Sequence, residues 1–133
     1  MVRTVDERDR GDATTQMILV VPIVVMLLMI AIQAALVYHS SAVASAAAAR
    51  GASTAAGAEF AGMAAAVSGV YAASDTVAEL GSELASTPAV GMADGMVTFT
   101  VVVKVPRVAP FFPSVITRTV VEPLERTTTE SQR

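Results

Sequence analysis

The sequence predicts a single-pass membrane α+β protein: a long N-terminal transmembrane helix continues into an Ala-rich helix, and a small C-terminal β-hairpin module follows. Three observations indicate this class: an apolar run near the N terminus, an Ala-rich stretch with helical periodicity, and two alternating segments near the C terminus. The 133 residues divide into five predicted segments. These are a cytoplasmic leader at 1–12, a transmembrane helix at 13–39 with its core at 17–38, an Ala-rich extracytoplasmic helical segment at 40–86, a β-hairpin module at 96–123 and a disordered tail at 124–133.

The predicted transmembrane helix lies in a stretch, residues 13–49, that contains no Asp, Glu, Lys or Arg. Its core covers roughly 33 Å at the helical rise of about 1.5 Å per residue, enough for a hydrocarbon layer of about 30 Å. A soluble core helix is the less favoured interpretation, because so short a chain has little with which to bury it. A cleaved signal peptide is also less favoured, because its apolar region is typically about 7–15 residues long.

Two residues inside the span are unusual for an apolar helix. Pro22 removes a backbone hydrogen bond, so we expect a kink there if the helix starts near Ala13. Gln33 is expected to bond internally or to a neighbouring helix, and a functional polar site is the alternative.

The basic residues around the span predict its orientation. Arg3, Arg8 and Arg10 precede the span, whereas the first basic residue after it is Arg50. The positive-inside rule therefore predicts a cytoplasmic N terminus and an extracytoplasmic C-terminal part, in the cell membrane.

The Ala-rich segment has larger apolar residues at intervals of three, four or seven, which is typical of one helix face. These residues are Phe60, Met63, Val67, Val70, Val77, Leu80 and Leu84. We expect this helix to reach about Ser86 before Pro88, Gly91 and Gly95 end it, with weak points at Gly51 and Gly57 that each cost about 1 kcal/mol against Ala. The apolar stripe either covers the protein's own sheet or forms a seam for a partner helix.

Two segments near the C terminus alternate apolar and polar residues, as half-buried strands do. Residues 96–106 place Val97, Phe99, Val101, Val103 and Val105 on one face, and residues 114–123 form the second predicted strand. The link between them contains Phe111 and Phe112, which either fold back on the hairpin or contact a partner or the lipid surface. Because an isolated hairpin is marginally stable in water, we expect the module to pack against the Ala-rich helix, the membrane or other subunits.

Composition argues against most chemical functions. The absence of Cys excludes disulfides and thiolate metal sites, and the single His39 leaves no cluster for a transition metal, so no metal or cofactor is expected. A net charge of −3 excludes the strongly basic footprint of a nucleic-acid binder. Asp75, Glu79 and Glu83 follow one helix face and are best interpreted as a solvated surface. We therefore expect no catalytic residues, no enzymatic activity and no small-molecule substrate.

The junction of leader and span, RGDATTQMILVVPIVV, resembles a type IV pilin-like precursor. More narrowly, it is similar to the TadE-like family of the tight-adherence (Flp) pilus system, with Gly11 and Pro22 at the family's Gly and Pro positions. Residues 46–53, AAAARGAS, are similar to the segment that follows the span in that family.

The resemblance implies processing and a structural role in filament assembly. A prepilin peptidase would cut after Gly11, Asp12 would become the new N terminus, and Gln16 stands where the pilin class has a Glu that meets a neighbour's terminal amine. The implied function is a TadE-like minor pilin or pseudopilin in a pilus or related secretion system. Its implied partners are membrane lipid, pilin-like subunits and pilus or secretion platform proteins.

Three other functions are weighed against this one. The alternative is an unprocessed single-pass envelope scaffold or adaptor unrelated to pili. A secreted soluble factor, cut near residue 45, and an enzyme that uses His39 are less favoured.

Overall fold

The chain forms two helices and three strands in a computed structural model that describes residues 7–57 and 62–124, with side chains from Gln16 onward. Helix α1 is Glu7–Ala56 and helix α2 is Met63–Glu79. The strands are β1, Ala89–Ala93, β2, Met96–Lys104, and β3, Val115–Pro123. The predicted fold class is confirmed: a long apolar N-terminal helix that could cross a membrane, a second helix and a small antiparallel sheet.

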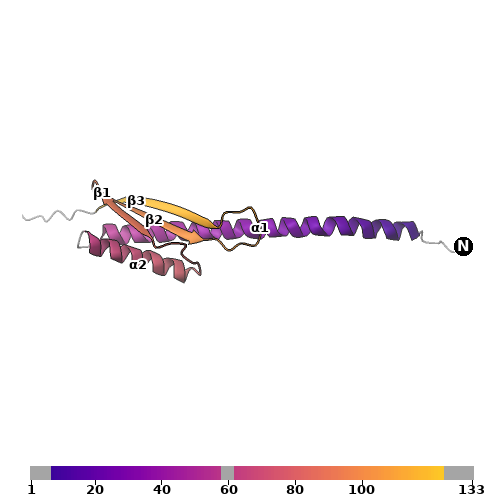
Figure 1. The fold of residues 1–133 in the computed structure, drawn as a ribbon, viewed down its shortest axis with the longest axis horizontal. Coiled ribbons are helices and arrows are strands. Elements are labelled where there is room, and N and C mark those ends of the chain that lie inside the picture. The colour runs from indigo at the N-terminus through magenta and orange to yellow at the C-terminus, as the bar shows by residue number, and fades with distance from the viewer. Residues whose placement is uncertain (1–6, 58–61, 125–133) are drawn as a thin grey trace, which may run out of the picture.

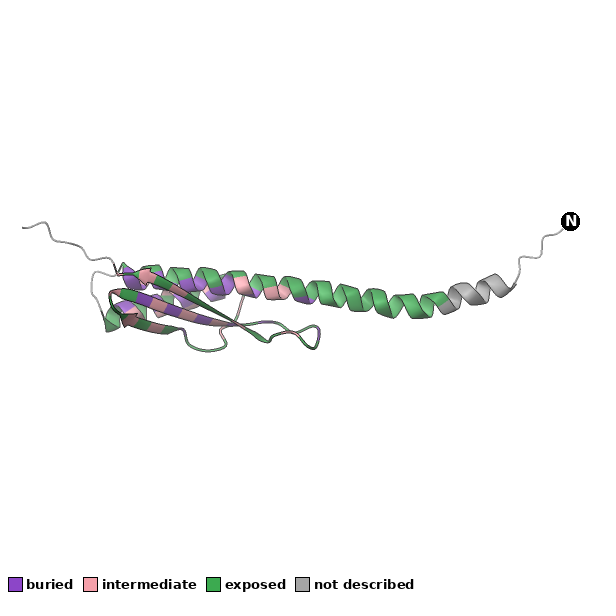
Figure 2. Cartoon of the chain, turned by 90° about the horizontal axis from the view of Figure 1, so that it is seen from above, coloured by how far each residue is buried: buried purple, intermediate pink, exposed green. Residues whose placement is uncertain are grey.

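Helix α1 has a bare half and a covered half. Its N-terminal half projects beyond all other elements, while its C-terminal half lies between α2 and the sheet (Figure 1). Colouring by burial shows the same division, because the projecting half is exposed and buried residues begin only where the module does (Figure 2). The apolar side chains of the projecting half, from Met17 to Ile32, are exposed. The helix that could cross a membrane is therefore also the central helix of the folded module.

The covered half of α1 packs through small residues. Ala44, Ala47, Ala48 and Ala52 are fully buried, so the sheet and α2 approach the backbone of α1 closely. The helix continues through Gly51 without interruption and ends at Ala56. Of the two predicted weak points, only Gly57 coincides with the end of a helix.

The sheet has the order β1-β2-β3 and is antiparallel throughout. Strand β2 alternates as predicted: Val97, Phe99, Val101 and Val103 are fully buried on the face that covers α1. In the register between β2 and β3, Lys104 is opposite Val115 and Met96 is opposite Pro123, which confirms the predicted hairpin.

Strand β1 was not predicted, because Pro88, Gly91 and Gly95 were interpreted as helix terminators. It pairs with β2 through a two-residue turn in which Asp94 and Gly95 both have positive φ, 52° and 74°. Asp-Gly is a preferred pair for this tight turn, because both central residues must adopt the left-handed conformation. This dipeptide is the signal in the sequence from which a third strand could have been predicted.

Helix α2 ends earlier than the predicted Ser86. Gly81, with φ 68°, donates its N–H to the Ala78 carbonyl, and Ser82 donates to the Val77 carbonyl, which together form a Schellman cap after Glu79. Residues beyond the cap are extended, and Leu84 forms a bridge with Val103 of β2. A glycine in the left-handed conformation therefore ends the helix before the proline is reached.

The apolar stripe predicted for α2 is only partly buried. The buried face consists mainly of smaller residues, Ala65, Gly69, Ala73 and Val77, and it packs chiefly against α1. The predicted stripe residues Met63, Val67 and Leu80 are exposed, whereas Val70 and Leu84 pack at the edge of the core. Phe60 lies outside the described residues. Of the two alternatives left open, a stripe that covers the protein's own sheet is therefore not observed for the stripe as a whole.

The two helices and the sheet meet at Gly51, Gly69 and Phe99. A Cβ atom added to Gly51 would lie 2.5 Å from Cε1 and Cζ of Phe99, and one added to Gly69 would lie 2.7 Å from the Gly51 carbonyl oxygen. The Phe99 ring thus occupies the space that the two glycines leave open. Gly51 is required by packing, whereas the sequence alone indicated only a weak point in a helix.

Replacing Gly51 with Ala is expected to destabilise the module by about 1–3 kcal/mol, the typical effect of overpacking a core. Helix propensity alone predicts the opposite sign, a gain of about 1 kcal/mol. Urea unfolding of the full chain in detergent micelles measures the difference. Phe99→Leu in the same chain should recover part of the loss by vacating ring volume, and a Gly51→Ala variant more stable than the parent would contradict the close packing.

The end of the sheet reaches Leu124, which was assigned to the disordered tail. Its N–H donates to the Gly95 carbonyl at 2.9 Å, and its side chain packs on the small cluster of Ala55, Ala56 and Val97. Leu124 therefore belongs to the module, and residues 125–133 lie outside the described residues.

Candidate functional site

The most distinctive polar group of the chain is Gln33, which is fully buried at the point where α1 enters the module. Its Oε1 accepts hydrogen bonds from the backbone N–H groups of Val108 at 2.7 Å and Ala109 at 3.1 Å. Its Nε2 donates to the carbonyl oxygen of Pro106 at 3.2 Å. One side chain on α1 thus binds three backbone groups in the first half of the link between β2 and β3. The prediction that Gln33 bonds internally is confirmed.

This link, residues 106–113, is called the proline loop here, because three of its eight residues are Pro106, Pro110 and Pro113. Its base is closed by a hydrogen bond from the Val105 N–H to the Ser114 carbonyl oxygen at 2.9 Å. Prolines carry no N–H, and Gln33 accepts two of the remaining N–H groups. The loop therefore has unusually few backbone donors that still require water.

The proline loop lies along the projecting half of α1. Together they enclose an open groove of about 490 Å³ with an almost wholly apolar lining. The lining residues are Pro22, Val25, Met26, Met29, Ile30, Ala109, Pro110, Phe111 and Phe112. At about 1.5 Å per residue, Met26 lies roughly 10 Å from Gln33 along the helix. The loop tip thus extends beside the part of α1 predicted to cross the membrane.

Phe111 and Phe112 have different environments in this loop. Phe112 is half-buried, whereas Phe111 is fully exposed and has a φ of 75°. A bulky residue rarely adopts this left-handed conformation, which costs about 1–3 kcal/mol and persists only where the surroundings enforce it. Of the two predicted arrangements, folding back onto the hairpin does not occur for Phe111, whose side chain is fully exposed.

Replacing Gln33 with Leu is expected to destabilise the module by at least about 1–3 kcal/mol, the cost of leaving a buried polar group unpaired. Leu keeps most of the side-chain volume but leaves two N–H groups and one carbonyl of the proline loop without their partner. Urea unfolding in micelles measures the loss, with Ala34→Leu at the exposed neighbouring position as the matched control. Equal stabilities of the two variants would show that Gln33 does not hold the loop.

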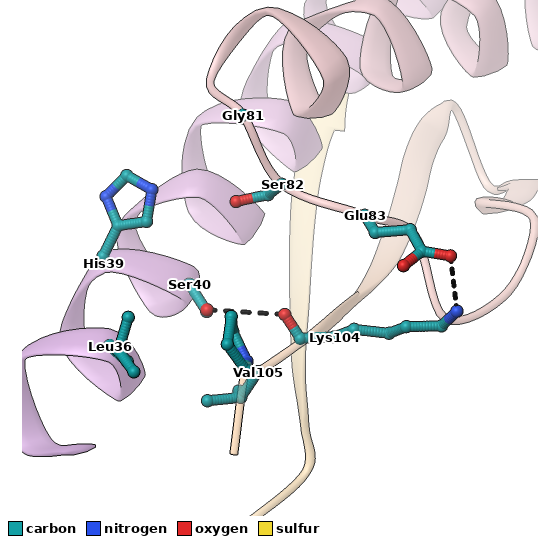
Figure 3. Close-up of a pocket in the computed structure, with 9 residues that line it drawn as sticks. Leu36, His39, Ser40, Gly81, Ser82, Glu83, Lys104 and Val105 are labelled. Carbon is teal, nitrogen blue, oxygen red and sulfur yellow. Dashed lines mark hydrogen bonds and ion pairs between the residues drawn. The ribbon is translucent and has the colours of Figure 1, made fainter. Parts of the chain in front are cut away.

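A second cleft, of about 670 Å³, lies between α1, the segment after α2 and the end of β2 (Figure 3). Its polar groups are engaged with each other: Lys104 Nζ lies 2.6 Å from Glu83 Oε1, and the Ser40 hydroxyl donates to the Lys104 carbonyl oxygen. His39 also lines this cleft, at the opposite side from the Glu83 carboxylate. Both members of the ion pair are half-exposed or more, so its contribution to stability is small.

The polar residues of this second cleft join separate segments of the chain to one another. Ser40 uses its hydroxyl hydrogen in a bond to the backbone, and Glu83 and Lys104 join the segment after α2 to β2 through both side chain and backbone. Within residues 16–57 and 62–124, no three His, Asp or Glu side chains come close enough together to hold a metal ion.

The predicted processing residues lie towards the N-terminal end of α1, before the helix residues that line the groove of the proline loop. Gly11 and Asp12 are in the first turns of the helix, and Gln16 follows with its side chain exposed. Pro22 lies inside α1 and lines the groove of the proline loop. The structure therefore separates the predicted processing end from the module, while Pro22 lies next to the loop. A role for Gly11, Asp12 and Gln16 in processing, and the kink at Pro22, stay predictions.

The fold and the site define a class, a protein in which, within the described residues, one helix is long and apolar enough to cross a membrane and also forms the core of a small α+β module. The family comparison adds a more specific finding. The model of the TadE-like protein family matches residues 11–53, which confirms the predicted resemblance over the predicted processing junction, the span and the first Ala-rich turns. Neither the curated proteins nor the solved structures include a match to this chain.

Proposed function

We propose that this protein is a TadE-like minor pilin or pseudopilin that helps to assemble or anchor a Flp-type pilus or a related secretion filament. The match of residues 11–53 to the TadE-like family is the observation that carries this proposal. The matched segment contains Gly11, the span and the first part of the covered half of α1. In this proposal the protein is a structural component without enzymatic activity.

The architecture supports a role in assembly. The exposed apolar half of α1 can pack laterally against other membrane helices, as subunits of a helical filament do. The same helix continues without a break to Ala56, where it is enclosed by α2 and the sheet. A force on the membrane end is therefore transmitted directly to the core of the module, which suits a subunit that is extracted from, or anchored in, the membrane.

The proposed orientation places the leader in the cytoplasm and the module outside. Arg3, Arg8 and Arg10 stand on the leader side and support it through the positive-inside rule. A pilus partner on the extracytoplasmic side would then contact the module, while a prepilin peptidase and the platform proteins would contact the membrane end.

Replacing Gly11 with Ala is expected to leave the precursor at full length, because the proposed peptidase cuts after this glycine. Intact-mass spectrometry of the protein from its native membrane shows from the total mass of the chain whether residues 1–11 are still present. The wild-type chain should begin at Asp12 and the Gly11→Ala chain at Met1. Processing that continues unchanged in the variant would remove Gly11 from the proposal.

One residue favours a second candidate function. Gln16 has no charge where the pilin class has a Glu, so it cannot form an ion pair with a neighbour's terminal amine. An unprocessed envelope scaffold or adaptor would not need this contact. A wild-type chain that keeps Met1 supports the scaffold, and one that begins at Asp12 supports the pilin-like protein.

The pilus role itself is tested by deleting the gene and counting surface filaments by electron microscopy. We expect filaments to be lost or sharply reduced, and to return with the wild-type gene. A Leu28→Lys gene should not restore them, because that chain is not expected to enter the membrane. Normal filament numbers in the deletion strain would contradict the proposal.

A further inference from the structure

We propose that the proline loop inserts into lipid, so that residues 109–112 occupy the membrane leaflet on the module's side, next to α1. The occupant of the groove and the neighbour of Phe111 would then be phospholipid acyl chains. This inference depends on α1 crossing the membrane, which is part of the proposed function, but not on the pilus role.

The first argument is position. Gln33 holds the base of the loop at the point where α1 leaves the module, and the groove residues Pro22 to Ile30 lie on the membrane side of that point. Every apolar residue of α1 from Met17 to Ile32 is exposed, so this stretch has to be covered by lipid or by another helix. Because the proline loop runs beside this stretch of α1, the loop lies in the same environment as the stretch.

The second argument is the backbone. Non-helical backbone is tolerated at membrane depth only where its polar groups find partners within the protein. Three prolines remove three donors from the loop, and Gln33 accepts the N–H groups of Val108 and Ala109 while donating to the Pro106 carbonyl. These features leave three loop N–H groups, those of Arg107, Phe111 and Phe112, still to be paired, and so reduce the cost of leaving water.

The third argument is side-chain chemistry. The tip consists of Ala109, Pro110, Phe111 and Phe112, and Phe111 is held fully exposed in a strained conformation. Arg107, near the base, is the loop's charged residue and is exposed. An apolar tip with a cation at its base matches a leaflet, where acyl chains lie below phosphate groups. The loop offers a protein partner no charged or hydrogen-bonding side chain beyond Arg107.

The chain contains no Trp, so a single Trp reports on one position without background. Phe111→Trp places it at the tip and Leu28→Trp on the exposed apolar part of α1, while Tyr71→Trp lies on the exposed surface of α2. Each full-length variant is reconstituted into phosphatidylcholine vesicles, with and without bromine atoms on the acyl chains. Brominated chains quench a Trp that touches them.

We expect Phe111→Trp to show blue-shifted emission and quenching as strong as that of Leu28→Trp, with Tyr71→Trp unquenched. Water-like, unquenched emission from Phe111→Trp beside a quenched Leu28→Trp would overturn the loop inference and leave the span intact. So would blue-shifted emission that resists quenching and increases with protein density, because a second copy would then cover the loop. An unquenched Leu28→Trp would instead contradict the membrane span itself.

A second variant tests the role of Gln33 in holding the loop. Adding Gln33→Leu to the Phe111→Trp chain should weaken the quenching at Phe111→Trp. Adding the same change to the Leu28→Trp chain should leave its quenching unchanged, which shows that the helix is still inserted. Undiminished quenching of the first double variant would mean that Gln33 does not set the position of the loop.

Discussion

Replacing Phe99 with Ala is expected to lower the free energy of unfolding of the module by about 3–5 kcal/mol, the typical range for a buried Phe. Among the residues whose burial is described, Phe99 is the largest fully buried side chain, and its ring fills the space between Gly51 on α1 and Gly69 on α2. Small neighbours cannot extend into the cavity that the ring leaves. A domain of this size is typically stable by only about 5–15 kcal/mol, so the loss is a large fraction of the total.

Urea unfolding of the full chain in micelles, followed by circular dichroism, measures this effect. Val121→Ala is the matched control, because Val121 lies on the edge strand β3 with half of its side chain exposed. It should change stability by no more than about 0.5 kcal/mol, as surface substitutions typically do. If Phe99→Ala has an effect as small as the control, the sheet does not pack against α1 and α2 at Gly51 and Gly69 as described.

Replacing Leu28 with Lys is expected to prevent most of the protein from entering the membrane. Lys near the centre of a spanning helix costs about 2.5–3.5 kcal/mol on insertion scales. Leu28 is exposed on the projecting half of α1 and does not line the groove of the proline loop, so the change leaves the module and the loop untouched. The fraction of protein that resists carbonate extraction from membranes measures the result.

Tyr38→Lys is the control for this experiment, because Tyr38 lies at the end of the apolar run, where a long Lys side chain can reach the interface. It should insert nearly as well as the wild type. A Leu28→Lys chain that resists carbonate to the same extent would show that this part of α1 does not lie in hydrocarbon.

The parts of the fold that follow from local pattern could be predicted from the sequence. The uncharged run before Arg50 indicated the long helix, and the alternation of Val97, Phe99, Val101 and Val103 indicated the buried face of β2. Strand β1 and the end of α2 were missed for a local reason. Gly81 was given no role and Gly95 was interpreted only as a helix terminator, although each adopts a left-handed conformation that defines a specific cap or turn.

The candidate site depends on contacts that no local pattern shows. Gln33 and the proline loop are separated by more than 70 residues in the sequence, and their hydrogen bonds arise only when the hairpin lies along α1. The same is true of Gly51, whose role is set by Phe99 almost fifty residues later. The sequence could indicate that Gln33 needs a partner, but the partner is chosen by how the sheet is placed on the helix.

The most direct test of the central claim asks on which side of the membrane each end of α1 lies. The chain has no Cys, so a single Cys can be placed at Ser53 on the exposed surface of the covered half, or at Thr4 in a Gly11→Ala chain, which is expected to keep its leader. A membrane-impermeant maleimide is then added to intact and to lysed spheroplasts. We expect the Ser53→Cys chain to be labelled in intact spheroplasts and the Thr4→Cys chain only after lysis. Labelling of both chains before lysis, or of Thr4→Cys alone, would contradict a helix that crosses the membrane once and carries the module outside.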